Sequence, residues 1–116
     1  MNKFMSLVVS LIILSSGLYA DNNAMIYEGQ KTYLIKLKGK FGLHANKFVL
    51  LHTIEEWRDL FSNNADGFIK QFSQRYPHSK RYLESIGFQE HAEALGMFAI
   101  RYAKDSTGKP LCTCAL

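Results

Sequence analysis

The chain has 116 residues, two cysteines and a formal net charge of +4, so it can form one small domain with its own core but not two. The excess of basic side chains is mild, which argues against a nucleic-acid-binding protein. Because both cysteines, Cys112 and Cys114, lie in the last five residues, no long-range disulfide can connect distant parts of the domain.

The first twenty residues have the layout of a secretory signal peptide. Lys3 supplies a positive charge, residues 7–14 form a short apolar run, and Ala20 offers a small residue for cleavage. The alternative, an uncleaved membrane anchor, is disfavoured because a spanning helix needs about 20 apolar residues. We therefore expect a signal peptide over 1–20, export to the bacterial periplasm and no stable membrane span after cleavage. Residues 21–116 then form a single helical domain with a net charge of +3.

Residues 24–38 fit a helix, with Ile26, Tyr33, Leu37 and Phe41 on one stripe and Gly39 and Gly42 ending it. The alternation of apolar residues with lysines leaves a hairpin over 31–52 as the alternative. A basic stretch without acidic residues runs through the same region, with Lys31, Lys36, Lys38, Lys40 and Lys47. It predicts either an ordinary solvated face or a docking surface for an acidic partner or anionic lipid headgroups.

Thr53 and Glu56 form the pattern of a capping box, which predicts a helix beginning at residue 54. Trp57 and Phe61 should face the core, and Asn63-Asn64 should end this helix. A second helix is expected over 65–75, stopping before Pro77.

The rest of the chain predicts two further helices. Ser79 can cap a short helix that Gly87 ends, and the long helix over 88–104 repeats apolar residues at spacings of four and three. The fold class is therefore all-α, a small bundle of four or five short helices.

Few residues suggest chemistry. Cys112 and Cys114 could form a strained disulfide, pair between molecules, hold a soft ion such as Cu(I) through two thiolates, or stay free thiols. The histidines lack the spacing that places two ligands on one helical face, and no nucleophile elbow, phosphate loop or Cys-x-x-Cys-His motif is present. An enzyme is therefore not expected.

Several short segments in order resemble a family of small periplasmic proteins known as cytochrome-c-like. The matching segments are Gly29-Gln30-Lys31, Lys36-Leu37-Lys38, Lys47-Phe48, His52-Thr53, Glu56-Trp57, Tyr102-Ala103-Lys104-Asp105-Ser106 and Pro110-Leu111-Cys112. Phe41 and Tyr76 stand where the family pattern has cysteines, so haem cannot be attached covalently in the c-type manner. The resemblance implies an all-helical fold and a periplasmic location.

Three functions are compatible with these features. The first is a non-enzymatic module that binds a periplasmic protein or a small ligand. The second, implied by the resemblance, is an electron carrier with non-covalently bound haem, in which His44 or His52 is one axial ligand and Met97 or another histidine is the other. The third is a thiol-redox or copper-handling protein that uses Cys112 and Cys114.

Overall fold

A computed structural model describes residues 22–107 of the chain. Every regular element in this range is a helix and no strand occurs in it, so the predicted all-α class is confirmed and the alternative hairpin over 31–52 is wrong. The predicted signal peptide and the two cysteines lie outside the described residues. None of the helices in the described range is long and apolar enough to cross a bilayer.

The first helix runs over residues 22–41 without a break, although its hydrogen bonding changes in the middle. An α-helical part over 22–32 leads into a π-helical turn, η1 (Tyr33–Leu37), in which the amide of Lys38 donates to the carbonyl of Tyr33 five residues earlier. The helix closes with α2 (Lys38–Phe41) and ends at Gly42, whose φ is +70°. Gly39 does not break the helix, contrary to expectation.

The π turn matches the spacing of the residues that face the core. Gly29, Tyr33, Leu37 and Phe41 are buried at intervals of four. In a regular α-helix such a stripe would rotate by about 40° per interval, because 3.6 residues make one turn. Local underwinding in the wider π turn offsets this rotation, which keeps the four residues on one side.

Helix α3 (Ala45–Val49) packs directly on the π turn. The Tyr33 ring stacks on Phe48 with 4.3 Å between ring centroids. The Tyr33 hydroxyl donates to the carbonyl of Leu43 at 2.6 Å, and burial raises the pKa of this hydroxyl well above its ordinary value. Tyr33 thus anchors the short connection between the two helices.

Helix α4 (Ile54–Arg75) begins at the predicted capping box and bends in the middle. The amide of Glu56 donates to Thr53 Oγ1 at 3.1 Å, and the amide of Thr53 donates to Glu56 Oε1 at 2.9 Å. Residues 62–65 leave helical geometry, so the expected helix end at Asn63-Asn64 is a bend between two helical halves. Phe68 and Phe72 in the second half are buried, as predicted.

The remaining elements are the 3₁₀ turn η2 (Pro77–Ser79), α5 (Lys80–Leu83) and α6 (Ile86–Arg101). Ser79 does not cap α5 through its side chain, because its hydroxyl donates to the carbonyl of Tyr76. Gly87 lies in the first turn of α6 rather than at a helix end. Ser85 is the N-cap of α6 and accepts from the amide of Phe88 at 3.1 Å.

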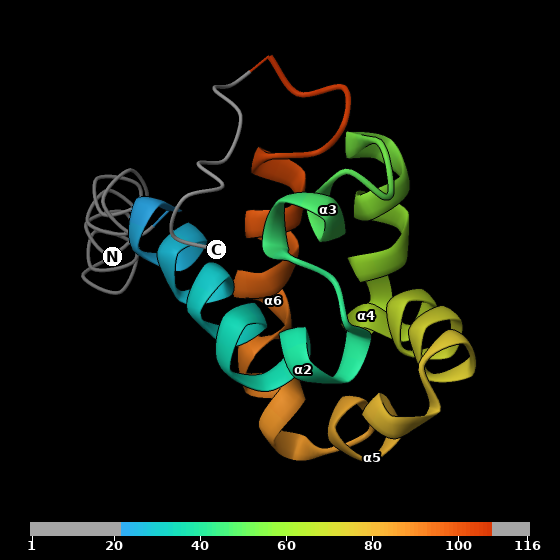
Figure 1. Ribbon diagram of the computed structural model, residues 1–116. Coiled ribbons are helices and arrows are strands. Elements are labelled where there is room, and N and C mark those ends of the chain that lie inside the picture. The colour runs from blue at the N-terminus through green and yellow to red at the C-terminus, as the bar shows by residue number, and fades with distance from the viewer. Residues whose placement is uncertain (1–21, 108–116) are drawn as a thin grey trace, which may run out of the picture.

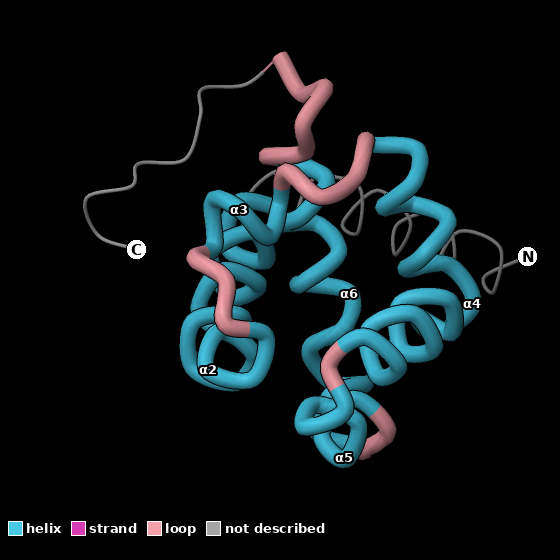
Figure 2. Tube along the Cα trace, turned by 45° about the vertical axis from the view of Figure 1, so that its right-hand side comes forward, coloured by secondary structure: helices cyan, strands magenta, loops and turns pink. Residues whose placement is uncertain are grey.

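Helix α6 is the centre of the bundle. Figures 1 and 2 both show it between the first helix and α4, and it also contacts α3 and α5. The core around it is dominated by aromatic side chains that are at most 5% exposed: Tyr33, Phe41, Phe48, Trp57, Phe68, Phe72, Phe88 and Phe98. Their rings meet in stacked and tilted pairs, such as Phe68 with Phe72 at 4.3 Å.

Candidate functional site

A cleft of about 400 Å³ lies between α4 and α6. Helix α4 contributes Arg58, Phe61, Ser62, Asn64 and Ala65 to its lining. Helix α6 contributes Gln89, Ala92, Glu93, Gly96, Met97 and Ile100. The α6 residues recur every three or four positions, which is the spacing that places side chains on one face of a helix.

The bend in α4 shapes one wall of this cleft. Asn63, Asn64 and Ala65 have φ values of 54°, 59° and 61°, all in the left-handed region. Asparagine tolerates this region better than most residues, whereas a left-handed alanine costs roughly 1–2 kcal/mol. The side-chain amide of Gln89 on α6 donates to the carbonyl of Asn64 at 2.9 Å and so ties the bend to the opposite wall.

Gly96 lets the two helices approach closely at the base of the cleft. A Cβ atom at this position would lie 2.9 Å from Cγ of Phe61. The Phe61 side chain therefore lies directly against the glycine, and its ring also stacks on Phe68 in the core with 4.5 Å between centroids. Met97 lies beside Gly96 and is only partly buried, so its thioether adds a polarizable surface to the cleft.

The cleft carries one positive and one negative side chain. Arg58 and Glu93 are both exposed, and neither forms an ion pair with another residue of the 22–107 range. The guanidinium of arginine is always charged and offers five hydrogen-bond donors. An apolar base with an unpaired guanidinium beside it suits a molecule with an apolar body and an anionic end.

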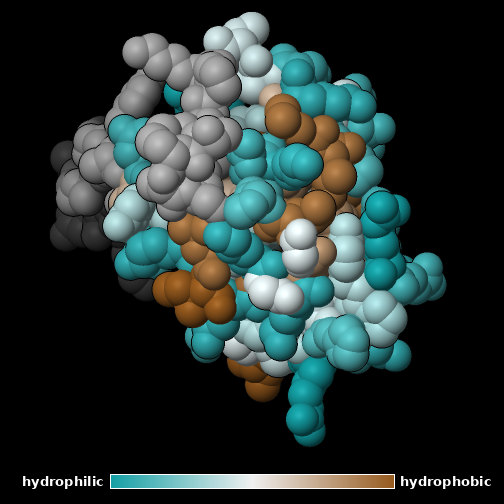
Figure 3. Space-filling model, viewed as in Figure 1, coloured by the Kyte–Doolittle hydropathy of each residue, from teal (hydrophilic) through white to brown (hydrophobic). Residues whose placement is uncertain are grey.

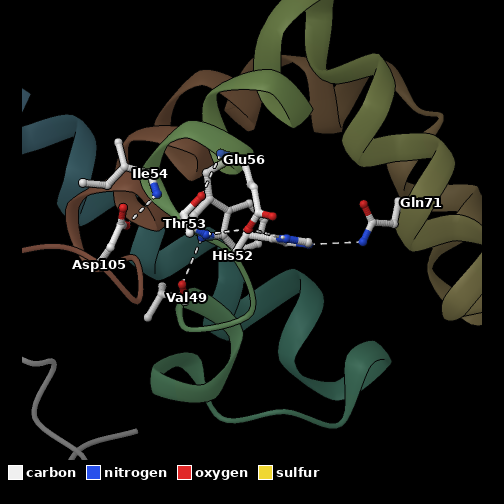
Figure 4. Close-up of polar contacts among 8 residues, drawn as sticks. Val49, His52, Thr53, Ile54, Glu56, Gln71 and Asp105 are labelled. Carbon is white, nitrogen blue, oxygen red and sulfur yellow. Dashed lines mark hydrogen bonds and ion pairs between the residues drawn. The ribbon is translucent and has the colours of Figure 1, made fainter.

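A second polar cluster lies at the N-terminal end of α4, where the chain returns after α6 (Figure 4). Asp105 accepts from the amide of Ile54 at 2.8 Å, and the amide of Lys104 donates to the carbonyl of His52 at 3.3 Å. A carboxylate at this end of a helix is favoured by the helix dipole. The cluster therefore fastens the segment after α6 to the start of α4.

His52 is held by this cluster on both sides of its ring. Nδ1 lies 3.4 Å from Glu56 Oε1, and Nε2 lies 3.1 Å from the amide nitrogen of Gln71. Because a carboxylate only accepts, the proton is assigned to Nδ1, and Nε2 then accepts from Gln71. The Thr53 amide, with a smaller contribution from His52, holds the pKa of Glu56 below its ordinary value.

Of the residues predicted to bind haem, only Met97 lines this cleft. His52 packs edge-on against Trp57 and has both ring nitrogens engaged, and His44 is an exposed residue that precedes α3. The three side chains therefore do not line this cleft together.

The predicted metal ligands Cys112 and Cys114 lie outside the described residues. Within 22–107, no three histidine, aspartate or glutamate side chains gather in a way that could hold a metal ion. Comparison of the chain with protein families, characterised proteins and solved structures gives no match. The resemblance to cytochrome-c-like proteins remains a prediction.

Sequence reasoning does not single out the cleft. It places Phe61 in the core, and it gives Arg58 no role. The available signal is the pair Asn63-Asn64, because two residues that tolerate left-handed backbone can mark a bend as well as a helix end.

Proposed function

We propose that this protein is an exported, non-enzymatic module that binds a small amphiphilic ligand in the cleft between α4 and α6. The ligand carries an apolar body and a carboxylate, sulfonate or phosphate end. The observation that carries the proposal is the unpaired Arg58 beside an apolar surface made by Phe61, Gly96 and Met97.

The size and composition of the cleft support this assignment. Its volume of about 400 Å³ is within the ordinary range for sites that take small molecules. Such sites combine mostly apolar walls with a few polar groups that orient the ligand, and here Gln89 and Asn64 add amide groups to the lining. The apolar body would pack on Phe61 and Met97, while the anionic end would meet the guanidinium.

Export to the periplasm is the second part of the proposal, and it rests on the signal-peptide pattern of residues 1–20. The intact mass of the protein recovered from a periplasmic fraction tests this part, and a mass that retains residues 1–20 would refute it.

Anilinonaphthalene sulfonate is a suitable probe for the cleft, because it joins apolar rings to a sulfonate. We expect saturable binding to the folded mature chain at a stoichiometry near one, measured by fluorescence titration and checked by calorimetry. Arg58→Gln should weaken binding about tenfold or more, since a hydrogen bond to a charged group contributes about 1.5–3 kcal/mol. Laurate should compete with the dye.

Two further variants separate the cleft from general dye binding. Met97→Trp should fill the cleft and abolish binding, whereas Arg81→Gln on α5, an exposed arginine outside the cleft, should leave it unchanged. Circular dichroism melting verifies that each variant is folded. Equal affinities for the Arg58 and Arg81 variants would refute the proposal. A Soret band in the protein as purified would also overturn it, in favour of a haem carrier.

A further inference from the structure

Large apolar side chains are exposed mainly in the first part of the described domain. Ile35 is 72% exposed, Tyr27 60%, Leu50 51% and Leu51 36%, and all four lie between the start of the first helix and the start of α4. Elsewhere in the described range, Ile86, at 81%, is the only other large apolar residue that is exposed. Single exposed apolar residues are ordinary, but a group of them calls for a physical reason.

Exposed lysines lie in the same stretch of the chain as these apolar residues. Lys31, Lys36, Lys40 and Lys47 are exposed, and the sequence has no acidic residue from 29 to 54. Lys31 pairs with Glu28 at 3.3 Å, whereas Lys36, Lys40 and Lys47 form no ion pair within the described part of the chain. The local charge is therefore strongly positive, although the whole chain is only mildly basic.

The helix geometry brings these two kinds of side chain together. Tyr27, Lys31 and Ile35 follow one another at intervals of four on the exposed side of the first helix, and the Lys31 amine lies 5.2 Å from the Tyr27 ring centre. The π turn contains Ile35 on its exposed side, and α3 packs on the buried side of the same turn, where Phe48 stacks on Tyr33. Figure 3 shows hydrophobic surface over the middle of the first helix and over α3 on the same side of the molecule, with hydrophilic surface between.

We propose that this basic face, formed by Lys31, Ile35, Lys36, Lys40, Lys47 and Leu50, adheres to the surface of a membrane that contains anionic phospholipids. Lysines attract such a surface electrostatically, and their long side chains can extend to the headgroups while neighbouring apolar residues enter the interface. The surface is separate from the cleft between α4 and α6.

An acidic protein is the alternative binding partner of the basic face. The exposed apolar residues favour a lipid surface over such a protein. A purely electrostatic contact needs the lysines but gains little from Ile35. An interfacial contact uses both, because the apolar side chain leaves water when it enters the headgroup region. Ile35 is the most exposed apolar residue among the lysines, so its contribution distinguishes the two occupants.

The test is co-sedimentation of the mature chain with vesicles of 30% phosphatidylglycerol in phosphatidylethanolamine, with phosphatidylcholine vesicles for comparison. We expect binding to the anionic vesicles only, and a large loss when salt rises from 0.05 M to 0.5 M. The double variant Lys36→Gln/Lys40→Gln should lower the partition coefficient about 25-fold, at about fivefold for each lysine. Ile35→Ser should lower it about tenfold.

Matched controls are available at exposed positions outside the basic face. Lys80→Gln on α5 and Ile86→Ser at the start of α6 should leave vesicle binding unchanged. The proposal fails if Lys36→Gln/Lys40→Gln binds vesicles as well as Lys80→Gln does, or if Ile35→Ser binds them as well as Ile86→Ser does. Lysine-dependent binding to polyglutamate that matches or exceeds vesicle binding would assign the face to an acidic protein instead.

Discussion

Gly29 is the position at which the first helix touches the backbone of α6. A Cβ atom at this residue would lie 2.0 Å from the carbonyl oxygen of Ala94 and 2.7 Å from Cβ of Phe98. Neither distance is possible for an alanine, and the first of the two contacts is with main chain, which cannot rotate away. Gly29→Ala therefore has to push the first helix off α6.

The expected cost follows from two opposing effects. Inserting a methyl group into a packed contact costs typically about 1–3 kcal/mol, and the backbone contact places this case in the upper part of that range. The better helix propensity of alanine returns about 0.5–1 kcal/mol. The net loss of about 2 kcal/mol should lower the melting temperature by roughly 8–16 °C for a domain of this size.

Gly39 provides the matched control, because it lies in the same helix at a place where a Cβ atom would meet no neighbouring side chain or element within 4 Å. Gly39→Ala should raise the free energy of unfolding by about 0.4–1 kcal/mol, since it restricts the unfolded chain. Thermal melting and urea titration measure both variants. If Gly29→Ala is as stable as Gly39→Ala, the close packing of the first helix on α6 is refuted.

Three further changes test local features. The Tyr82 hydroxyl is buried with no hydrogen-bond partner among the described residues, so Tyr82→Phe should raise the free energy of unfolding by about 1 kcal/mol in urea titration, and a loss would refute this. Asn63 has a φ of 54°, which glycine adopts more easily than alanine. The free energy of unfolding of Asn63→Gly should therefore exceed that of Asn63→Ala by about 1–2 kcal/mol. The pKa of Glu56 is lowered on folding by the Thr53 amide, so its contribution to stability is complete above its ordinary pKa of 4.5 and is lost as the pH falls through the lower value in the folded state. In Glu56→Gln the free energy of unfolding should fall less steeply as the pH drops below 4.5. An unchanged slope would contradict a contribution of Glu56 to this fall.

Sequence patterns predict those features that depend on residues close together in the chain. The capping box of Thr53 and Glu56 is a contact between residues three apart, and the inward positions of Phe68 and Phe72 follow from helical periodicity alone. The long helix α6 is predictable for the same reason. Such patterns are readable because the physical interaction lies within one or two helical turns.

Features that depend on packing between distant segments cannot be read in the same way. The π turn at Tyr33–Leu37 is needed because the inward side of the first helix must stay against its neighbours. Gly87 resembles a helix end in the sequence, but Ser85 begins α6 just before it. The cleft exists only where the bend of α4 meets α6, so nothing local to Arg58 distinguishes it from other surface arginines.

The two proposed binding surfaces use different helices, which makes them separable by experiment. The cleft belongs to α4 and α6, whereas the basic face belongs to the first helix and α3. Substitutions at sites without shared partners usually add in free energy. The double variant Arg58→Gln/Ile35→Ser should therefore lose dye affinity to the same extent as Arg58→Gln alone and vesicle affinity to the same extent as Ile35→Ser alone. Any departure beyond about 0.5 kcal/mol would mean that the first helix and α6 transmit binding from one surface to the other, and their close contact at Gly29 is the place where such coupling would pass.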